Sequence, residues 1–286
     1  MDLVALLAIQ VLYAIAGLAL ISVGLAIIFG MMRVINLAHG EFLMIGMYAC
    51  YWIVVFSGLD PLFLWAATGI FVFIVSASSY KLIVRRSIGK AAMAPLLATF
   101  GLSVFLKNFC LNRFSPNFRL LHDTMTGGKV INLSGVFIPV PQLITALSSL
   151  VMLGVLYWLI KKTRIGWAIQ ATAMDSEAAE LMGIDTERIF TLVFGLGGMC
   201  VGIAGAFIAS YLSVFPEVGS LFSLIAFVVV ALGGFGSIPG ALCAALLIGL
   251  VESFAGFYIA PIIKYVAVFA LYIVVIMVRP KGLFGW

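Results

Sequence analysis

Few side chains in this sequence could perform chemistry, and the densest group of them is Asn36, His39 and Glu41. An imidazole and a carboxylate two residues apart could relay protons or hold an ion, and with the amide they could bind a polar solute. The same residues could instead serve the fold. His39 could be a helix-end histidine satisfied by a carbonyl, and Glu41 a first-turn carboxylate stabilised by the helix dipole. Both interpretations stay open at this point.

A second group of such residues surrounds the run Gly-Gly-Phe-Gly-Ser-Ile-Pro-Gly at 233–240. Glycine and proline remove the preference for helix there and free backbone groups for other partners. Downstream, Glu252 lies in an apolar segment, where a carboxylate normally faces the protein interior or a cavity. A lysine or a backbone donor would be an equally good partner for it. The residues that we predict along a solute pathway are Asn36, His39, Glu41, Phe235, Ser237, Pro239 and Glu252.

Two common catalytic patterns, the phosphate loop and the nucleophile elbow, are absent from the sequence. Neither Gly-Lys pair is followed by Ser or Thr, so the phosphate loop G-x-x-x-x-G-K-[ST] does not occur. A G-x-S-x-G elbow around Ser237 is excluded because Phe235 stands where its first glycine is needed. The four cysteines form no C-x-x-C pair that would suggest a metal site. We therefore predict a chain that is not an enzyme and that binds no cofactor or metal itself.

The composition indicates what kind of element must position these groups. Of 286 residues, 64% are hydrophobic and only 9% are charged, and the mean hydropathy is +1.25. Several uncharged runs reach the roughly 20 residues that a membrane-spanning helix needs, and none shows the alternation of barrel strands. We predict one all-α domain over residues 1–286, a polytopic helical bundle of eight to ten membrane segments with broken or re-entrant helices. Glycines at 195–205 are interpreted as sites of close helix packing.

The two breaks, at 33–41 and 233–240, fall in opposite halves of the chain. Irregular backbone at membrane depth is tolerated only when it is buried in protein or faces water. Paired interruptions of this kind are the usual sign of a solute site between inverted repeats in secondary transporters. The breaks therefore predict where a solute would pass.

Basic residues concentrate at 81–90, 161–188 and 279–281. The positive-inside rule places these clusters in the cytoplasm, which puts the polar stretch 112–132 and the N-terminus outside and the C-terminus inside. The net charge of +5 then reflects orientation and anionic headgroups, and no nucleic acid is required.

The longest predicted cytoplasmic loop, residues 161–189, contains a short helix. Asp175 has the residue type of an N-cap, Glu177 suits the first turn, Ala178 and Ala179 favour helix, and Gly183 can end it. Isolated helices of about two turns are marginal in water. We therefore expect this one to dock onto another body, although packing against its own bundle or the headgroups is an alternative.

Three segments together resemble one protein family, the LivH-type permeases of branched-chain amino acid ABC importers. They are Gly30–Gly46, Arg164–Asp185 and Gly233–Gly240, and the likeness continues through the ending Arg279–Gly285. In this family the loop helix is the counterpart of the "EAA" coupling helix, which sits in a cleft of the ATP-hydrolysing subunit. The resemblance gives that role to Asp175, Glu177, Ala178, Ala179 and Gly183.

The resemblance also implies a set of partners in a bacterial inner membrane. These are a second permease chain, like or unlike this one, two ATPase subunits that bind the ATP and magnesium, and a periplasmic solute-binding protein. Relatives with the same signatures carry branched-chain or other amino acids, urea or short amides. The competing class is a stand-alone secondary transporter or channel, in which Glu41, Glu252 or His39 would relay protons or hold an ion.

Overall fold

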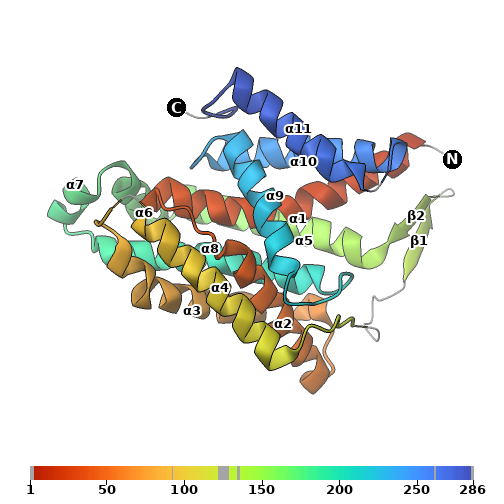
Figure 1. Ribbon diagram of the computed structural model, residues 1–286, viewed down its shortest axis with the longest axis horizontal. Coiled ribbons are helices and arrows are strands. Elements are labelled where there is room, and N and C mark those ends of the chain that lie inside the picture. The colour runs from red at the N-terminus through yellow and green to blue at the C-terminus, as the bar shows by residue number, and fades with distance from the viewer. Residues whose placement is uncertain (1–2, 92, 122–128, 134–135, 261, 285–286) are drawn as a thin grey trace.

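The fold is a bundle of long helices with a small hairpin at one end (Figure 1). The computed structural model describes residues 3–91, 93–121, 129–133, 136–260 and 262–284. The long helices are α1 (Leu3–Met32), α2 (His39–Ser57), α3 (Trp65–Leu82), α4 (Ala94–Phe114), α5 (Val140–Lys162), α8 (Thr186–Ile208), α9 (Val218–Gly233), α10 (Ile238–Tyr258) and α11 (Ile263–Val278). The short elements are the 3₁₀ turns η1 (Pro61–Phe63) and η2 (Val84–Ser87), helices α6 (Arg164–Met174) and α7 (Ser176–Leu181), and strands β1 (Val130–Leu133) and β2 (Val136–Pro139).

The predicted helical membrane bundle is confirmed. Among the described residues, six helices are long and apolar enough to cross a membrane. Three shorter apolar stretches, Gly17–Met32, Val218–Gly233 and Ile263–Val278, accompany them. Six and three give nine segments, within the predicted eight to ten. The apolar run 130–160 is not one helix, however, because its first residues form the antiparallel hairpin β1–β2 before α5 begins.

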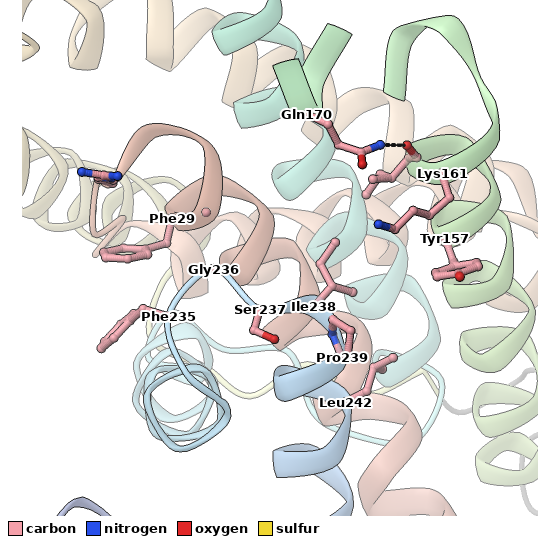
Figure 2. Close-up of a pocket in the computed structure, with 13 residues that line it drawn as sticks. Phe29, Tyr157, Lys161, Gln170, Phe235, Gly236, Ser237, Ile238, Pro239 and Leu242 are labelled. Carbon is pink, nitrogen blue, oxygen red and sulfur yellow. Dashed lines mark hydrogen bonds between the residues drawn. The ribbon is translucent and has the colours of Figure 1, made fainter. Parts of the chain in front are cut away.

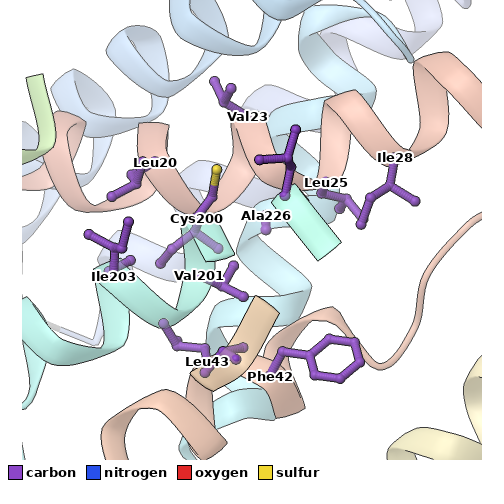
Figure 3. Packing of buried hydrophobic residues seen from close by; sticks show 14 of the residues in the cluster. Leu20, Val23, Leu25, Ile28, Phe42, Leu43, Cys200, Val201, Ile203 and Ala226 are labelled. Atoms are coloured by element: carbon purple, nitrogen blue, oxygen red, sulfur yellow. The ribbon is translucent and has the colours of Figure 1, made fainter. Parts of the chain in front are cut away.

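Helices α1 and α8 form the centre of the bundle. Helix α10 packs along α1 and α3 along α8, with α2 against α8 from another side. Figure 3 shows part of the shared core, to which Leu20 and Val23 of α1, Val201 of α8 and Phe42 of α2 contribute. Since lipid tails are as apolar as leucine, close packing and interhelical hydrogen bonds must hold such helices together.

The glycines of α8 permit this close packing, as the sequence suggested. A Cβ added at Gly202 would stand 2.7 Å from the Cβ of Val72 on α3. One turn away, the hydroxyl of Ser76 donates a 2.7 Å hydrogen bond to the carbonyl of Phe194. The two backbones approach so closely that only glycine fits at position 202 of α8.

The two ends of the bundle differ. Helices α6 and α7 protrude at one end, and β1 and β2 lie at the other (Figure 1). We call these the α7 end and the hairpin end. Helix α9 crosses the direction of α1, α8 and α10 instead of running along them, which brings its first residues beside the start of α2.

Candidate functional site

The first break returns the chain into the bundle. Helix α1 ends at the α7 end, where Arg33 adopts a left-handed backbone with φ 52° that is uncommon for a residue with a side chain. Residues 33–36 are then irregular. The side-chain oxygen of Asn36 accepts a 3.1 Å hydrogen bond from the amide of Ala38, and the Thr99 hydroxyl donates a 3.0 Å bond to the Ile35 carbonyl. Side chains thus satisfy backbone groups that a regular helix would have satisfied itself.

His39 lies at the first residue of α2, near the middle of the bundle. Its Nε2 is 2.9 Å from the carbonyl of Ile21, and the ring is fully buried. Ile21 stands 11 residues before the end of α1, which is about 16 Å along a helix axis and half of a hydrocarbon core of about 30 Å. Helix α2 therefore begins inside the bundle, about 16 Å from the end of α1 along that helix. The structure thus shows a helix-end histidine with Nε2 beside a carbonyl, while its buried Nδ1 has no hydrogen-bond partner among the described residues.

Two helix starts meet beside His39. Gly40 of α2 faces Gly219 of α9, and a Cβ on Gly40 would collide with the Gly219 carbonyl and stand 2.6 Å from the Cβ of Ser223. Both glycines are therefore needed for the approach. The contact joins the first break to a helix that leads directly to the second.

Glu41 follows at this junction and lines a cavity of about 550 Å³. The residue is only 3% exposed. Oε1 accepts a 3.3 Å hydrogen bond from the Ser103 hydroxyl, whereas Oε2 is buried and has no hydrogen-bond partner among the described residues. The cavity lies among α2, α4, α9 and α11, and its lining residues are Leu37, Glu41, Phe100, Ser103, Ser220, Ser223, Leu224, Phe227, Val228, Ala231, Phe235 and Tyr272.

The second break contains a helix start and a tight loop. The Ser237 hydroxyl accepts a 3.0 Å bond from the amide of Gly240, which makes Ser237 the N-cap of α10, and Pro239 lies in its first turn. Gly234 and Gly236 have φ of 97° and 84°, a region that favours glycine. Ser237 and Pro239 thus serve local structure, and Phe235 is the side chain of this loop that faces open space, being 45% exposed.

The C-terminal segment covers the same loop. The amides of Leu283 and Phe284 donate to the carbonyls of Leu232 and Gly233, at 2.8 and 3.1 Å. These carbonyls end α9 and have no partner within the helix. The backbone groups freed by the break are therefore satisfied by the protein itself.

Phe235 lines two cavities. It lines the cavity of Glu41 and also a second one of about 590 Å³ at the α7 end. In Figure 2, Phe235 and Phe29 face one another, 4.6 Å apart between ring centres, while Tyr157 and Lys161 project from α5 on the opposite side. A solute leaving the first cavity toward the α7 end would pass Phe235.

Glu252 lies apart from both cavities, near the turn between α10 and α11. Its Oε1 accepts a 2.7 Å hydrogen bond from the Lys264 ammonium, and the side chains are 17% and 30% exposed. The structure thus shows the lysine partner that was one of the two interpretations of this carboxylate. A role for Glu252 on the pathway stays a prediction.

We expect Lys264→Met to lower the free energy of unfolding by about 1–3 kcal/mol, because it leaves a largely buried carboxylate unpaired. The double variant Glu252→Gln/Lys264→Met should recover most of that loss. Unfolding experiments in detergent measure the free energy of unfolding of the single and the double variant. Arg188→Met is a suitable control, since its ion pair with Asp185 is exposed and such pairs contribute about 0–1 kcal/mol. Equal instability of the single and double variants would contradict the pairing argument.

The protruding loop contains the expected short helix. The Asp175 carboxylate accepts 3.0 Å hydrogen bonds from the amides of Glu177 and Ala178, and Gly183 ends the helix with φ 85°. Only Ala179 is buried. Met174, Leu181 and Met182 are 88%, 88% and 84% exposed. Large apolar side chains thus project from the tip of the molecule.

A helix that sequence reasoning missed, α6, connects this tip to α5. The Thr163 hydroxyl caps it by accepting from the amide of Gly166, and Gln170 donates a 2.7 Å bond to the carbonyl of Ile160 on α5. Thr163 as an N-cap and the buried spacing of Gly166, Ile169 and Thr172 were the available signals. The α6 contact fixes α7 to the end of a long helix.

The sequence is similar to a known protein family along nearly its whole length. A family model described as "Branched-chain amino acid transport system / permease component" matches residues 7–278. Over 280 residues, the chain is 32% identical to the high-affinity branched-chain amino acid transport system permease protein LivH of Escherichia coli, covering 93% of this chain and 91% of that protein. BraD of Pseudomonas aeruginosa, a permease protein of the same description, gives the same identity and coverage.

Among solved structures, "PsaBC from Streptococcus pneumoniae in complex with Fab" is similar, with a TM-score of 0.52 and 12% identity over 96% of this chain and 92% of that one. At this identity the likeness concerns the fold alone. The match nevertheless covers 96% of this chain, so the fold has a counterpart in a solved protein.

Proposed function

The chain belongs to the branched-chain amino acid transport permease family, and we propose that it forms the membrane pathway of an ATP-driven importer for branched-chain or closely related amino acids. The observation that carries the proposal is α7, a two-turn helix whose neighbourhood exposes Met174, Leu181 and Met182. Such a helix suits the cleft of an ATPase subunit. Urea or short amides are the related cargo classes.

The proposed assembly has two permease chains, like or unlike, around a central pathway. Two ATPase subunits hold ATP and magnesium against the α7 ends, and a periplasmic binding protein delivers solute to the hairpin ends. In this orientation, in a bacterial inner membrane, the N-terminus is outside and the C-terminus is cytoplasmic, which puts the basic residues around 81–90 and 161–188 inside.

Coupling follows from how α7 is attached. On one side α6 connects it to α5 through the Gln170–Ile160 hydrogen bond, and on the other the Asp185 carboxylate caps α8 by accepting from the amide of Arg188 at 3.0 Å. Since α8 is central to the bundle, a push on α7 displaces α5 and the core together. Closure of the ATPases would in this way rock the helices around the two breaks.

The pathway that we propose runs through the two cavities on either side of Phe235. A solute released at the hairpin end enters the cavity of Glu41 and leaves past Phe235 and Phe29 toward the cytoplasm. Both cavities are largely apolar with few polar groups. Weak contacts suit this task, because the binding protein provides the affinity and a tight internal site would slow release.

Uptake into proteoliposomes tests the function. With the ATPase subunits, the partner permease and the loaded binding protein present, we expect radiolabelled leucine to accumulate only when ATP is supplied on the α7 side, and an uncoupler to leave the rate unchanged. The secondary-transporter alternative makes the opposite prediction. Accumulation driven by a proton or sodium gradient without ATP would overturn the proposal.

A further inference from the structure

The cavity at the first break contains a single carboxylate with one unoccupied oxygen, and its chemistry points to a specific ligand group. Resting on the proposed function, we propose that Glu41 binds the ammonium group of the amino acid as it passes through this cavity. The pathway then contributes selectivity of its own, favouring solutes with a free amino group over neutral amides or 2-oxo acids of the same shape.

The first argument is the state of the Glu41 side chain. The residue is only 3% exposed, yet among the described residues its carboxylate accepts a hydrogen bond only from Ser103, on Oε1, and Oε2 has no partner. A buried carboxylate oxygen that lacks a donor is costly, so structures normally satisfy it. An ammonium group brings three donors and a compensating charge.

The second argument is that the nearby lysine is already engaged. Lys107 of α4 acts electrostatically on Glu41 but forms its ion pair with Glu217, at 2.9 Å. No salt bridge to Glu41 occurs among the described residues. Glu252, the other carboxylate of the apolar segments, has its own lysine. Of these two, Glu41 alone lacks a cation in the described structure.

The third argument is the shape and lining of the cavity. Its volume of about 550 Å³ is within the usual range for small-molecule sites of about 300–1,000 Å³. Phe100, Leu224 and Phe227 provide apolar walls for an aliphatic side chain. Ser220 and Ser223 bring hydroxyl donors that suit the carboxylate group of the solute. Glu41 would thus hold the cationic end while the serines face the anionic one.

The position of Glu41 explains how the contact can stay transient. The carboxylate lies in the first turn of α2, where the helix dipole stabilises negative charge even without a ligand. Gly219 packs against it so closely that an added Cβ would be 3.0 Å from Oε2. Because Gly219 belongs to α9, movement of α9 relative to α2 would change access to that oxygen and release the solute.

The test uses the complete reconstituted transporter with radiolabelled leucine. Glu41→Gln keeps the shape and removes the charge, so we expect uptake to fall about 10-fold, the loss of one charge-assisted hydrogen bond. ATP hydrolysis stimulated by the loaded binding protein should stay within about twofold of the original rate, since Glu41 is remote from α7. Glu41→Asp should restore part of the uptake. Glu217→Asp, which lies outside the cavity and keeps the charge that pairs with Lys107, should change uptake less than about twofold.

A second measurement does not depend on the folding of Glu41 variants. Ser223→Cys is placed in the cavity of a Cys243→Ser background, since Cys243 is the exposed cysteine among the described residues. Millimolar leucine should slow alkylation of the new thiol, whereas 4-methyl-2-oxopentanoate, which has the same skeleton without the ammonium, should not. Adding Glu41→Gln should remove this discrimination.

The outcomes separate the two proposals. If the unaltered complex does not import leucine with ATP, the proposed function fails. If it does, but Glu41→Gln imports at the unaltered rate, or leucine and its 2-oxo acid protect the thiol equally, the Glu41 inference is overturned while the function stands.

Discussion

Leu181→Asp should reduce ATP-coupled uptake by about 30-fold or more, the effect typical of a central contact in a protein interface. Leu181 ends α7 and is 88% exposed, so it contributes little to the fold of its own chain. In the proposed assembly it lies in an apolar cleft of the ATPase. A carboxylate there would be desolvated without a partner, which weakens docking and breaks the link between ATP hydrolysis and the bundle.

The matched control is Leu181→Met, which keeps size and polarity and should retain most of the uptake. Both variants should unfold at nearly the same temperature as the original chain, because exposed substitutions change stability by only about 0.5 kcal/mol. The amount of ATPase subunit that co-purifies with each variant in detergent measures the docking directly. Normal uptake and normal co-purification with Leu181→Asp would exclude α7 as the coupling contact.

Gly40→Ala should prevent the bundle from assembling normally. The added Cβ would collide with the carbonyl of Gly219, and a backbone atom cannot move aside as the end of a flexible side chain can. Overpacking of this kind costs about 1–3 kcal/mol, and more when backbone must shift. Folded yield in detergent and the midpoint of thermal unfolding should both fall clearly.

Gly154→Ala provides the comparison, since a Cβ on Gly154 of α5 meets nothing within 4 Å. Alanine favours helix by about 1 kcal/mol over glycine, so this variant should be as stable as the original or slightly more so. If Gly40→Ala unfolded at the same temperature as Gly154→Ala, the close meeting of α2 and α9 would not exist in the folded protein.

Much of the bundle could be predicted from the sequence, because helix length in lipid is set by the apolar run. The N-cap at Asp175 and the end of its helix at Gly183 follow from local residue types. Hairpin β1–β2 was hidden inside an apolar run, whose composition fits a strand as well as a helix. Helix α6 was missed because its amphipathic face is short. It also lies within residues 161–189, which the basic residues had marked as a cytoplasmic loop.

The site was predictable only in part. The break at 33–41 indicated irregular backbone, and His39 indeed meets a carbonyl, but its partner Ile21 lies 18 residues away on another helix. The sequence around Lys107 did not indicate that it pairs with Glu217, which lies 110 residues later. Contacts of this kind depend on how helices cross, which residue types do not determine. The placement of Phe235 against both cavities has the same origin.

The start of α2 inside the bundle, away from the end of α1, has a consequence for biosynthesis. Residues 33–38 carry backbone and side-chain polar groups that a bilayer alone cannot satisfy, and Gly40 meets Gly219 only after about 180 further residues have been made. At about 5–20 residues per second the ribosome needs roughly 9–36 seconds for that interval. During this time the nascent re-entrant segment must stay near water or be shielded by the insertion machinery, so chaperoned membrane insertion, not helix hydrophobicity alone, should limit how much of this protein a cell can produce.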